Sequence, residues 1–273
     1  MPAMKQMSAG DVFTADPENQ NNSLSDRELQ DRLIDYLTDA NLRCSGPSPD
    51  FLNETQADRA QRFSRFLARR YYRDRLYRGF HYSKDVLKSE SGPAEIVESP
   101  QFDAILAGCV LGSLVTAKAV GNLVLSVLRS LRSDEWWSEL LEYEFAFFLQ
   151  LATLEVPRAA GLSQLCPSTI VREFQFRIPD VLRHLKSGDT PVTDVRGSTV
   201  LLFSRTPHGK IYVVELDVTA AAVVRGVDGK RTNAEIAGAA GIALEEATRI
   251  LAELSSINAI VSADGNPLND SLT

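Results

Sequence analysis

Cysteine and histidine are scarce in this chain, and their spacing excludes several classes of metal and redox protein. The 273 residues include three cysteines and three histidines. Cys44, Cys109 and Cys166 lie far apart and form no C-x-x-C pair, which fits neither a disulfide framework nor a zinc knuckle. The histidines also lack the spacing of metal ligands. We therefore expect this chain to contain no metal and no cofactor.

Recognisable catalytic motifs are missing as well. The sequence contains no G-x-S-x-G element, no Cys–His arrangement, no P-loop and no G-x-G-x-x-G phosphate cradle. These absences favour a chain that is not an enzyme in its own right. A stand-alone enzyme whose site is assembled from scattered residues is an alternative, which activity of the purified chain with added iron would support.

A surplus of positive charge is also lacking. The formal net charge is −7 at pH 7, whereas nucleic-acid binding requires a surplus of lysine and arginine on one face. The charge therefore argues against a general nucleic-acid binder. Residues 1–24 are polar and acidic, without the apolar segment of a secretory signal. We expect a flexible tail there and a cytoplasmic location.

One apolar segment is long enough to require a test for membrane insertion. Residues Ile105–Leu128 are mostly apolar, but Lys118 lies near the centre of the segment and Asn122 is close by. A lysine at the middle of a bilayer costs about 2.5–3.5 kcal/mol. The segment is therefore predicted to be a buried helix, and no membrane partner is expected.

Helical patterns dominate the first half of the chain. Ser25 and Glu28 have the spacing of a capping box, which marks the start of a first amphipathic helix. A loop is predicted over Cys44–Asn53, followed by a helix over Thr55–Phe80 that carries many arginines. Residues 25–160 are thus predicted to form a helical domain.

The character of the sequence changes beyond about residue 168. Three short apolar or alternating segments are typical of strands, and a Pro-His-Gly turn joins the second to the third. Three helical segments follow, and Thr232 with Glu235 marks the start of the second of these. The predicted strands and helices are, in order, Val171–Phe176, Val200–Phe203, Ile211–Leu216, Val218–Arg225, Asn233–Ala240 and Leu244–Ile257.

These patterns predict an α+β fold, with an N-terminal all-helical domain and a C-terminal winged-helix-like domain of antiparallel strands plus three helices. The second domain spans residues 168–265, and a tail follows over residues 266–273. Such a domain binds either DNA through its third helix or a peptide that adds to its sheet edge. Three glutamates against one arginine within Leu244–Leu254 would repel phosphate, so DNA binding by this helix is disfavoured.

Peptide capture by strand addition is the favoured alternative. An open strand edge offers unpaired N–H and C=O groups, and a neighbouring helix supplies side-chain pockets. If Ile211–Leu216 is that edge, residues of the third helix line the groove beside it. The predicted peptide-binding residues are Lys210, Ile211, Tyr212, Val213, Val214, Glu245, Thr248, Arg249 and Ala252.

The same region resembles the PqqD family. The resemblance lies in Leu216–Val224 and in Asp228–Thr232, which reads Asp-Gly-Lys-Arg-Thr before a helix, and it covers about residues 198–263. Members of that family are recognition elements for the leaders of ribosomally synthesised, modified peptides. The resemblance implies a leader bound as an added strand between the third strand and the third helix.

The helical half resembles accessory proteins of the HvfC, MbnC and TglI type, with the TglI type closest. The resemblance lies in Trp136–Ala146 and Arg70–Arg75, and it covers about residues 28–155. Such proteins accompany a separate multinuclear non-haem iron enzyme that oxidises cysteine residues of a precursor peptide. The resemblance implies a heterodimer in which the partner holds the iron. It also implies oxidative excision of a carbon from a C-terminal cysteine, as in a thiaglutamate-type pathway.

Two sets of residues are candidates for docking such a partner. The first is a row of arginines at i, i+3 and i+4 spacing, which would contact an acidic surface by bidentate pairs. The second is a pair of tryptophans. A solvated helix face is an equal alternative for the arginines, and core packing is the first interpretation of the tryptophans. The docking candidates are Arg62, Arg65, Arg69, Arg73, Trp136 and Trp137.

Together these features predict a non-catalytic subunit that binds the leader of a precursor peptide and presents the peptide to an iron enzyme. The alternative from another class is a winged-helix transcriptional regulator with a helical sensor domain, which would use the arginine-rich helix on DNA. Salt-sensitive binding of duplex DNA would favour the regulator.

Overall fold

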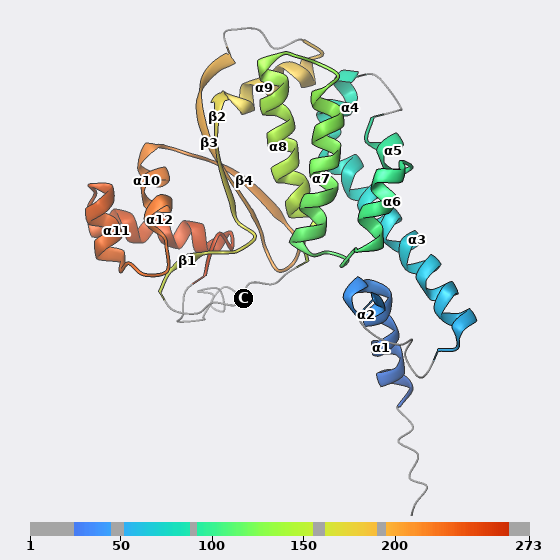
Figure 1. The fold of residues 1–273 in the computed structure, drawn as a ribbon. Coiled ribbons are helices and arrows are strands. Elements are labelled where there is room, and N and C mark those ends of the chain that lie inside the picture. Colours follow the sequence, from blue (N-terminus) through green and yellow to red (C-terminus); the bar gives the residue numbers. More distant parts are fainter. Residues whose placement is uncertain (1–24, 45–51, 88–91, 155–161, 190–194, 262–273) are drawn as a thin grey trace, which may run out of the picture.

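The chain has an α+β fold, with helices in its first part and antiparallel strands in its second part, as predicted (Figure 1). The computed structural model describes residues 25–44, 52–87, 92–154, 162–189 and 195–261. The predicted tails, residues 1–24 and 266–273, lie outside these ranges. The helices are α1 (Asp26–Thr38), α2 (Ala40–Cys44), α3 (Glu54–Gly79), α4 (His81–Leu87), α5 (Gly92–Val97), α6 (Pro100–Ala107), α7 (Leu114–Arg129), α8 (Glu135–Ala152), α9 (Ile178–Ser187), α10 (Val218–Gly226), α11 (Asn233–Ala240) and α12 (Leu244–Ser256). The strands are β1 (Gln164–Leu165), β2 (Ile170–Phe176), β3 (Arg196–Arg205), β4 (Ile211–Leu216) and β5 (Ile260–Val261).

Helix α8 occupies the centre of the helical part, because most of its side chains are apolar and buried. Helix α7 packs antiparallel to it. The indole Nε1 of Trp137 donates to the carbonyl of Leu128 at 3.0 Å, and the N–H of Leu154 donates to the carbonyl of Gly112 at 2.8 Å. Gly121 lies against the ring of Phe145, which leaves no room for a Cβ. The two helices therefore approach closely along their whole length.

Capping residues fix several helix starts where the sequence predicted them. Ser25 and Glu28 form the predicted capping box of α1, and Thr232 and Glu235 form that of α11. Helix α3 begins after Asn53, whose side chain accepts from the N–H of the third helical residue. The long arginine-rich helix is thus confirmed, and the predicted loop before it lies mostly outside the described residues.

The single buried helix predicted over Ile105–Leu128 is wrong, because the segment divides into α6 and α7. Gly112 has a φ of 76°, a left-handed conformation that no helix interior adopts. Ser113 then caps α7 by accepting from the N–H of Thr116. The glycine and the capping serine were not recognised in the sequence, because the residues on both sides of them are apolar. None of the described helices combines the length and the apolar character that crossing a bilayer requires.

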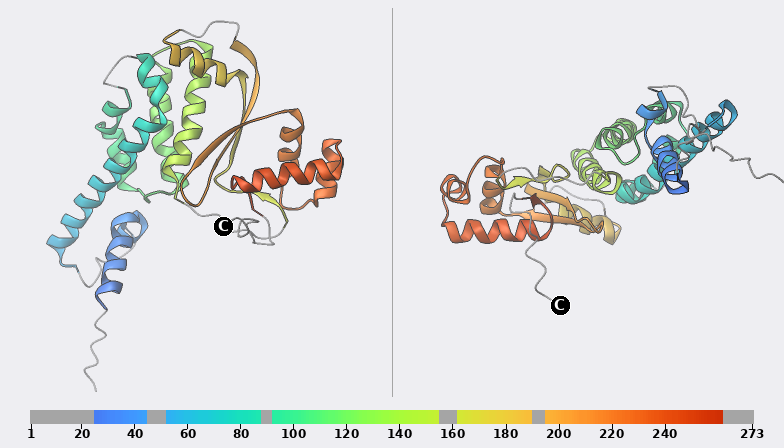
Figure 2. Two further views of the ribbon diagram at one scale, coloured as in Figure 1. Left: turned by 180° about the vertical axis from the view of Figure 1, so that it is seen from behind. Right: turned by 90° about the horizontal axis from the view of Figure 1, so that it is seen from below.

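Strands β2, β3 and β4 form an antiparallel sheet in the order β2-β3-β4, with core residues on both faces. Leu201 and Phe203 belong to the core shared with the helical part, whereas Leu202 belongs to a second core with α10, α11 and α12. The sheet therefore lies between the two groups of helices, as the right-hand view in Figure 2 shows.

Two features of the second part were not predicted. Helix α9 connects β2 to β3, although Pro179 in its first turn and the left-handed Gly188 at its end are ordinary helix signals. Strands β1 and β5 form a separate two-stranded pair, which ties the entry of this part to its last described residues. Helices α10, α11 and α12 match the three predicted helices to within a residue at each end.

Candidate peptide-binding site

Strand β4 lies at the edge of the three-stranded sheet. The sequence predicted the strand but did not show that it is an edge. The N–H of Thr206 donates to the carbonyl of Lys210 at 2.9 Å, and β4 continues in the same register along β3. Because hydrogen-bonded and non-bonded pairs alternate in an antiparallel ladder, the N–H and C=O groups of Ile211, Val213 and Glu215 point away from β3. No described strand pairs with this edge, so it is open to an added strand.

The side chains of β4 divide between the two faces of the sheet. Val214 packs against the core formed with α10, α11 and α12, whereas Val213 packs against the core of the helical part. Tyr212 lies on the same face as Val214 by strand alternation, and the Nζ of Lys210 lies 4.6 Å from the centre of the Tyr212 ring. The strand thus presents side chains toward both helical layers.

Helix α12 packs under the face of the sheet to which Tyr212 belongs. Its buried side is apolar, and its C-terminal end lies near the hairpin, since the Oγ of Ser204 donates to the carbonyl of Ile257 at 2.9 Å. Ser204 is the partner of Tyr212 in the ladder. The predicted residues of this helix form an exposed stripe at i, i+3, i+4 and i+7, namely Glu245, Thr248, Arg249 and Ala252.

Two of the stripe residues already have partners in the free chain. The Nη1 of Arg249 pairs with Glu253 at 2.8 Å, and the hydroxyl of Thr248 donates to the carbonyl of Leu244 at 2.8 Å. A bound peptide would have to compete for Arg249, which an exposed ion pair of this kind permits at low cost. The exposed charge of α12 is acidic, with Glu245, Glu246 and Glu253 against one arginine.

The Asp-Gly-Lys-Arg-Thr segment serves the local fold. Asp228 accepts from the backbone N–H groups of Lys230 at 2.9 Å and Arg231 at 3.1 Å, and the bond from Lys230 is the main reason that the pKa of Asp228 is lowered. Gly229 has a φ of 76° and donates to the carbonyl of Ser163. The segment is thus a turn that leads into the cap of α11.

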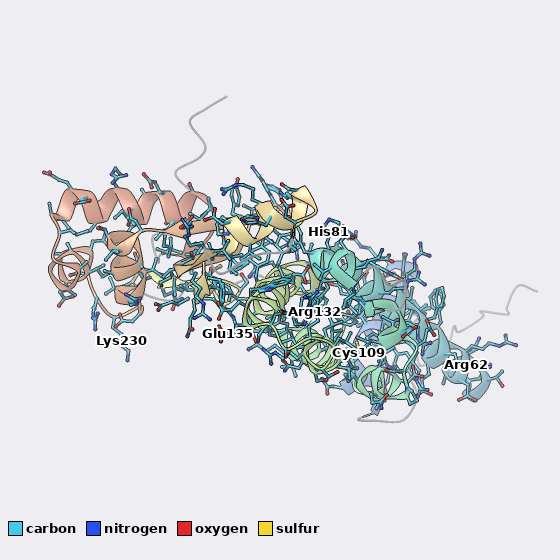
Figure 3. The ribbon with its side chains drawn as sticks, turned by 90° about the horizontal axis from the view of Figure 1, so that it is seen from above. Arg62, His81, Cys109, Arg132, Glu135 and Lys230 are labelled. Carbon is cyan, nitrogen blue, oxygen red and sulfur yellow. The ribbon has the colours of Figure 1, made fainter. Side chains whose placement is uncertain are left out.

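The four predicted docking arginines differ in their surroundings. Arg69 forms ion pairs within the chain, with Glu98 at 2.7 Å and also with Asp103, so it is less available to a partner. Arg73 lies 3.7 Å from its neighbour Asp74. Arg62 and Arg65 are exposed and form no ion pair with the described residues. Figure 3 places Arg62 and Lys230 at opposite ends of the molecule.

The aromatic residues near these arginines are also divided. Trp137 is 1 % exposed and Trp136 is 8 % exposed, so both indoles pack within the chain and offer a partner little surface. Phe63 and Phe66 are instead 50 % and 56 % exposed, with ring centroids 6.3 Å apart on α3. Sequence reasoning placed these two phenylalanines in the apolar stripe of the helix and missed their exposure. Their position among exposed arginines was the available signal.

No group of three or more His, Cys, Asp and Glu residues in the described ranges is placed to hold a metal ion. Burial raises the pKa of the Cys109 thiol to about 11, which makes it a poor nucleophile. Neither a family model nor a curated protein matches the sequence.

Proposed function

We propose that this chain is a non-catalytic partner subunit that binds the leader of a ribosomally synthesised precursor peptide. The observation that carries the proposal is the open outer edge of β4, beside a domain whose last helix exposes a row of polar side chains. A leader in extended conformation would add to β4 through the backbone groups of Ile211, Val213 and Glu215. Backbone pairing supplies affinity, and side chains of α12 supply specificity.

The role of the chain is then delivery of the peptide to a multinuclear non-haem iron enzyme in the cytoplasm. A tethered precursor reaches the partner's iron site at high effective concentration, which raises the rate without any chemistry in this chain. The reaction class is oxidation of a cysteine in the precursor, including excision of a carbon from a C-terminal cysteine. The iron and its ligands belong to the partner.

Surface charge and exposed apolar area support a separate role for each end of the molecule. Glu245, Glu246 and Glu253 make α12 acidic, so the preferred leader carries basic residues beside this helix. The partner enzyme docks at the other end, where Phe63 and Phe66 supply apolar area and exposed arginines surround them. An acidic rim around an apolar hollow is the complementary partner surface.

The decisive experiment removes one outward N–H group from β4. Glu215 is exposed, and its N–H points away from β3, so Glu215→Pro blocks strand addition without breaking the β3–β4 ladder. In a calorimetric titration with a leader from the same locus, we expect this variant to bind about ten-fold more weakly or not at all. The matched control Glu215→Ala keeps the N–H and should bind nearly as well as the native chain.

Other outcomes would redirect the assignment. Equal binding by the Pro and Ala variants would show that the leader does not add to β4. Salt-sensitive binding of duplex DNA, with no leader binding at all, would support a transcriptional regulator instead.

A further inference from the structure

A cavity lies at the opposite edge of the sheet, between β2 and the helix pair α7–α8. Its volume is about 640 Å³, which is within the range of ordinary ligand sites. The floor is apolar, with Phe145 and Leu149 from α8. Lys118 and Asn122 from α7 form one side, and residues 167–173 form the other. The cavity thus runs along the outer edge of β2.

The backbone of β2 is open along this cavity. Strand β3 uses its residues 200, 202 and 204 to pair with β4, so residues 199, 201 and 203 pair with β2. The N–H and C=O groups of Val171 and Glu173 therefore point outward, and both residues line the cavity. The next outward N–H, that of Gln175, is already capped by a carboxylate oxygen of Glu139 at 2.7 Å. That bond closes the edge beyond Glu173.

Buried polar atoms in the lining are left without partners. Gln150 is 2 % exposed, and its Nε2 donates to the carbonyl of Ser168 at 2.5 Å. Its Oε1 has no hydrogen-bond partner among the described residues. Thr153 is 7 % exposed, and its hydroxyl has no partner in the same part of the chain. Buried polar atoms are nearly always bonded in native proteins. Both atoms are buried in the free chain, so they add polar character to the wall of the cavity without being direct contact points.

The charge of the cavity is set by Lys118. It is exposed and forms no ion pair with any residue that the structure describes. Arg172, the other lining cation, is paired with Glu142. Glu173 lies 3.9 Å from Arg225, and its side chain points to the other face of the sheet by alternation. The free charge facing a ligand is therefore positive.

From these features we infer that the cavity binds an extended acidic peptide segment, which adds to the outer edge of β2 as a fourth strand. Outward backbone groups of Val171 and Glu173 pair with the peptide, apolar side chains of the peptide cover Phe145 and Leu149, and a peptide carboxylate pairs with Lys118. This site goes beyond the proposed function, because β2 and β4 are opposite edges, and it prefers the opposite charge.

The test uses the full chain and two fluorescein-labelled hexapeptides, in which valine alternates with glutamate or with lysine. In the Glu215→Pro background, which blocks addition to β4, fluorescence anisotropy should show binding of the glutamate peptide about ten-fold tighter than that of the lysine peptide. Lys118→Glu should reverse this preference. Glu173→Pro removes an outward N–H and should abolish binding, whereas Glu173→Gln keeps the N–H and should bind normally. Amide exchange at Val171 should slow when the peptide binds.

Several results would overturn the inference. One is no binding of the glutamate peptide, and a second is binding that survives Glu173→Pro but is lost in Glu215→Pro, which would assign the peptide to β4. A third is an amide of Val171 that is already protected in the free chain, which would mean that the chain fills the cavity itself. Leader binding to β4 is measured separately, so either site can fail without deciding the other.

Discussion

Glu144 is a carboxylate buried completely between α8 and the start of α4. It accepts from the backbone N–H of Tyr82 at 2.6 Å and from that of Ser83 at 3.1 Å. Burial raises its pKa to about 8, against the lowering effect of these hydrogen bonds. The side chain therefore holds α4 in place and retains its proton at neutral pH.

This burial predicts a pH dependence of stability. The pKa of Glu144 is about 8 in the folded chain, against a usual value of 4.5. The folded state is therefore most stable below about pH 4.5, where Glu144 is protonated in both states, and this stability is lost as the pH rises through about 8. Urea unfolding at a series of pH values should show this loss in the native chain and a flatter profile in Glu144→Gln. Glu144→Ala leaves two backbone N–H groups without their acceptor and should cost about 2 kcal/mol or more at low pH, where Glu144 is protonated. This cost should shrink as the pH rises through about 8, because the variant has no buried carboxyl group to ionise. An unchanged profile in Glu144→Gln would assign the dependence to another group.

At the scale of the elements, the contact between α7 and α8 depends on Gly121. A Cβ at this position meets the rings of Phe145 and Phe148, so Gly121→Ala should destabilise the fold by about 1–3 kcal/mol. Gly238 in α11 is the matched control, because it is helical and exposed and has nothing within 4 Å of an added Cβ. Gly238→Ala should stabilise by about 0.5–1 kcal/mol. Chemical denaturation of both variants measures the two shifts, and equal shifts would contradict the close packing.

Element positions were predictable where a local signal was strong. The capping boxes of Ser25 and Thr232 mark true helix starts, because a cap needs only residues a turn apart. The break before Ser113 was missed, since apolar residues on both sides of it resemble one helix. Burial was harder to predict than helix position. The pattern of α3 does not show that its N-terminal end extends past the body and exposes Phe63 and Phe66.

At the scale of the whole molecule, both candidate sites arise from contacts that the sequence does not encode locally. The strand order decides which edges are open, and it depends on the β2–β3 pairing, which joins residues as far apart in sequence as Ile170 and Phe203. The β2 cavity combines Lys118, Gln150 and Glu173 from three elements, and no motif links them. The candidate peptide-binding residues of β4 and α12 came from the predicted edge strand with its neighbouring helix, and from a resemblance to a recognition domain. The candidate docking arginines were found from their spacing along one helix. The ion pair between Arg69 and Glu98 could not be predicted in this way, because it forms only in the tertiary fold.

Under the proposed function, partner docking and leader binding take place at opposite ends of the molecule and are therefore separable. Phe63→Ser combined with Phe66→Ser removes the exposed apolar pair of α3. This double variant should associate about ten-fold or more weakly with the proposed partner iron enzyme from the same locus. The reason is that aromatic side chains buried at an interface supply much of its binding energy. Leader affinity should stay unchanged, since α3 lies far from β4. Val218→Ser is the matched control, being 88 % exposed in α10. Sedimentation velocity of the mixed proteins measures the complex, and equal weakening by the control would place the docking surface elsewhere.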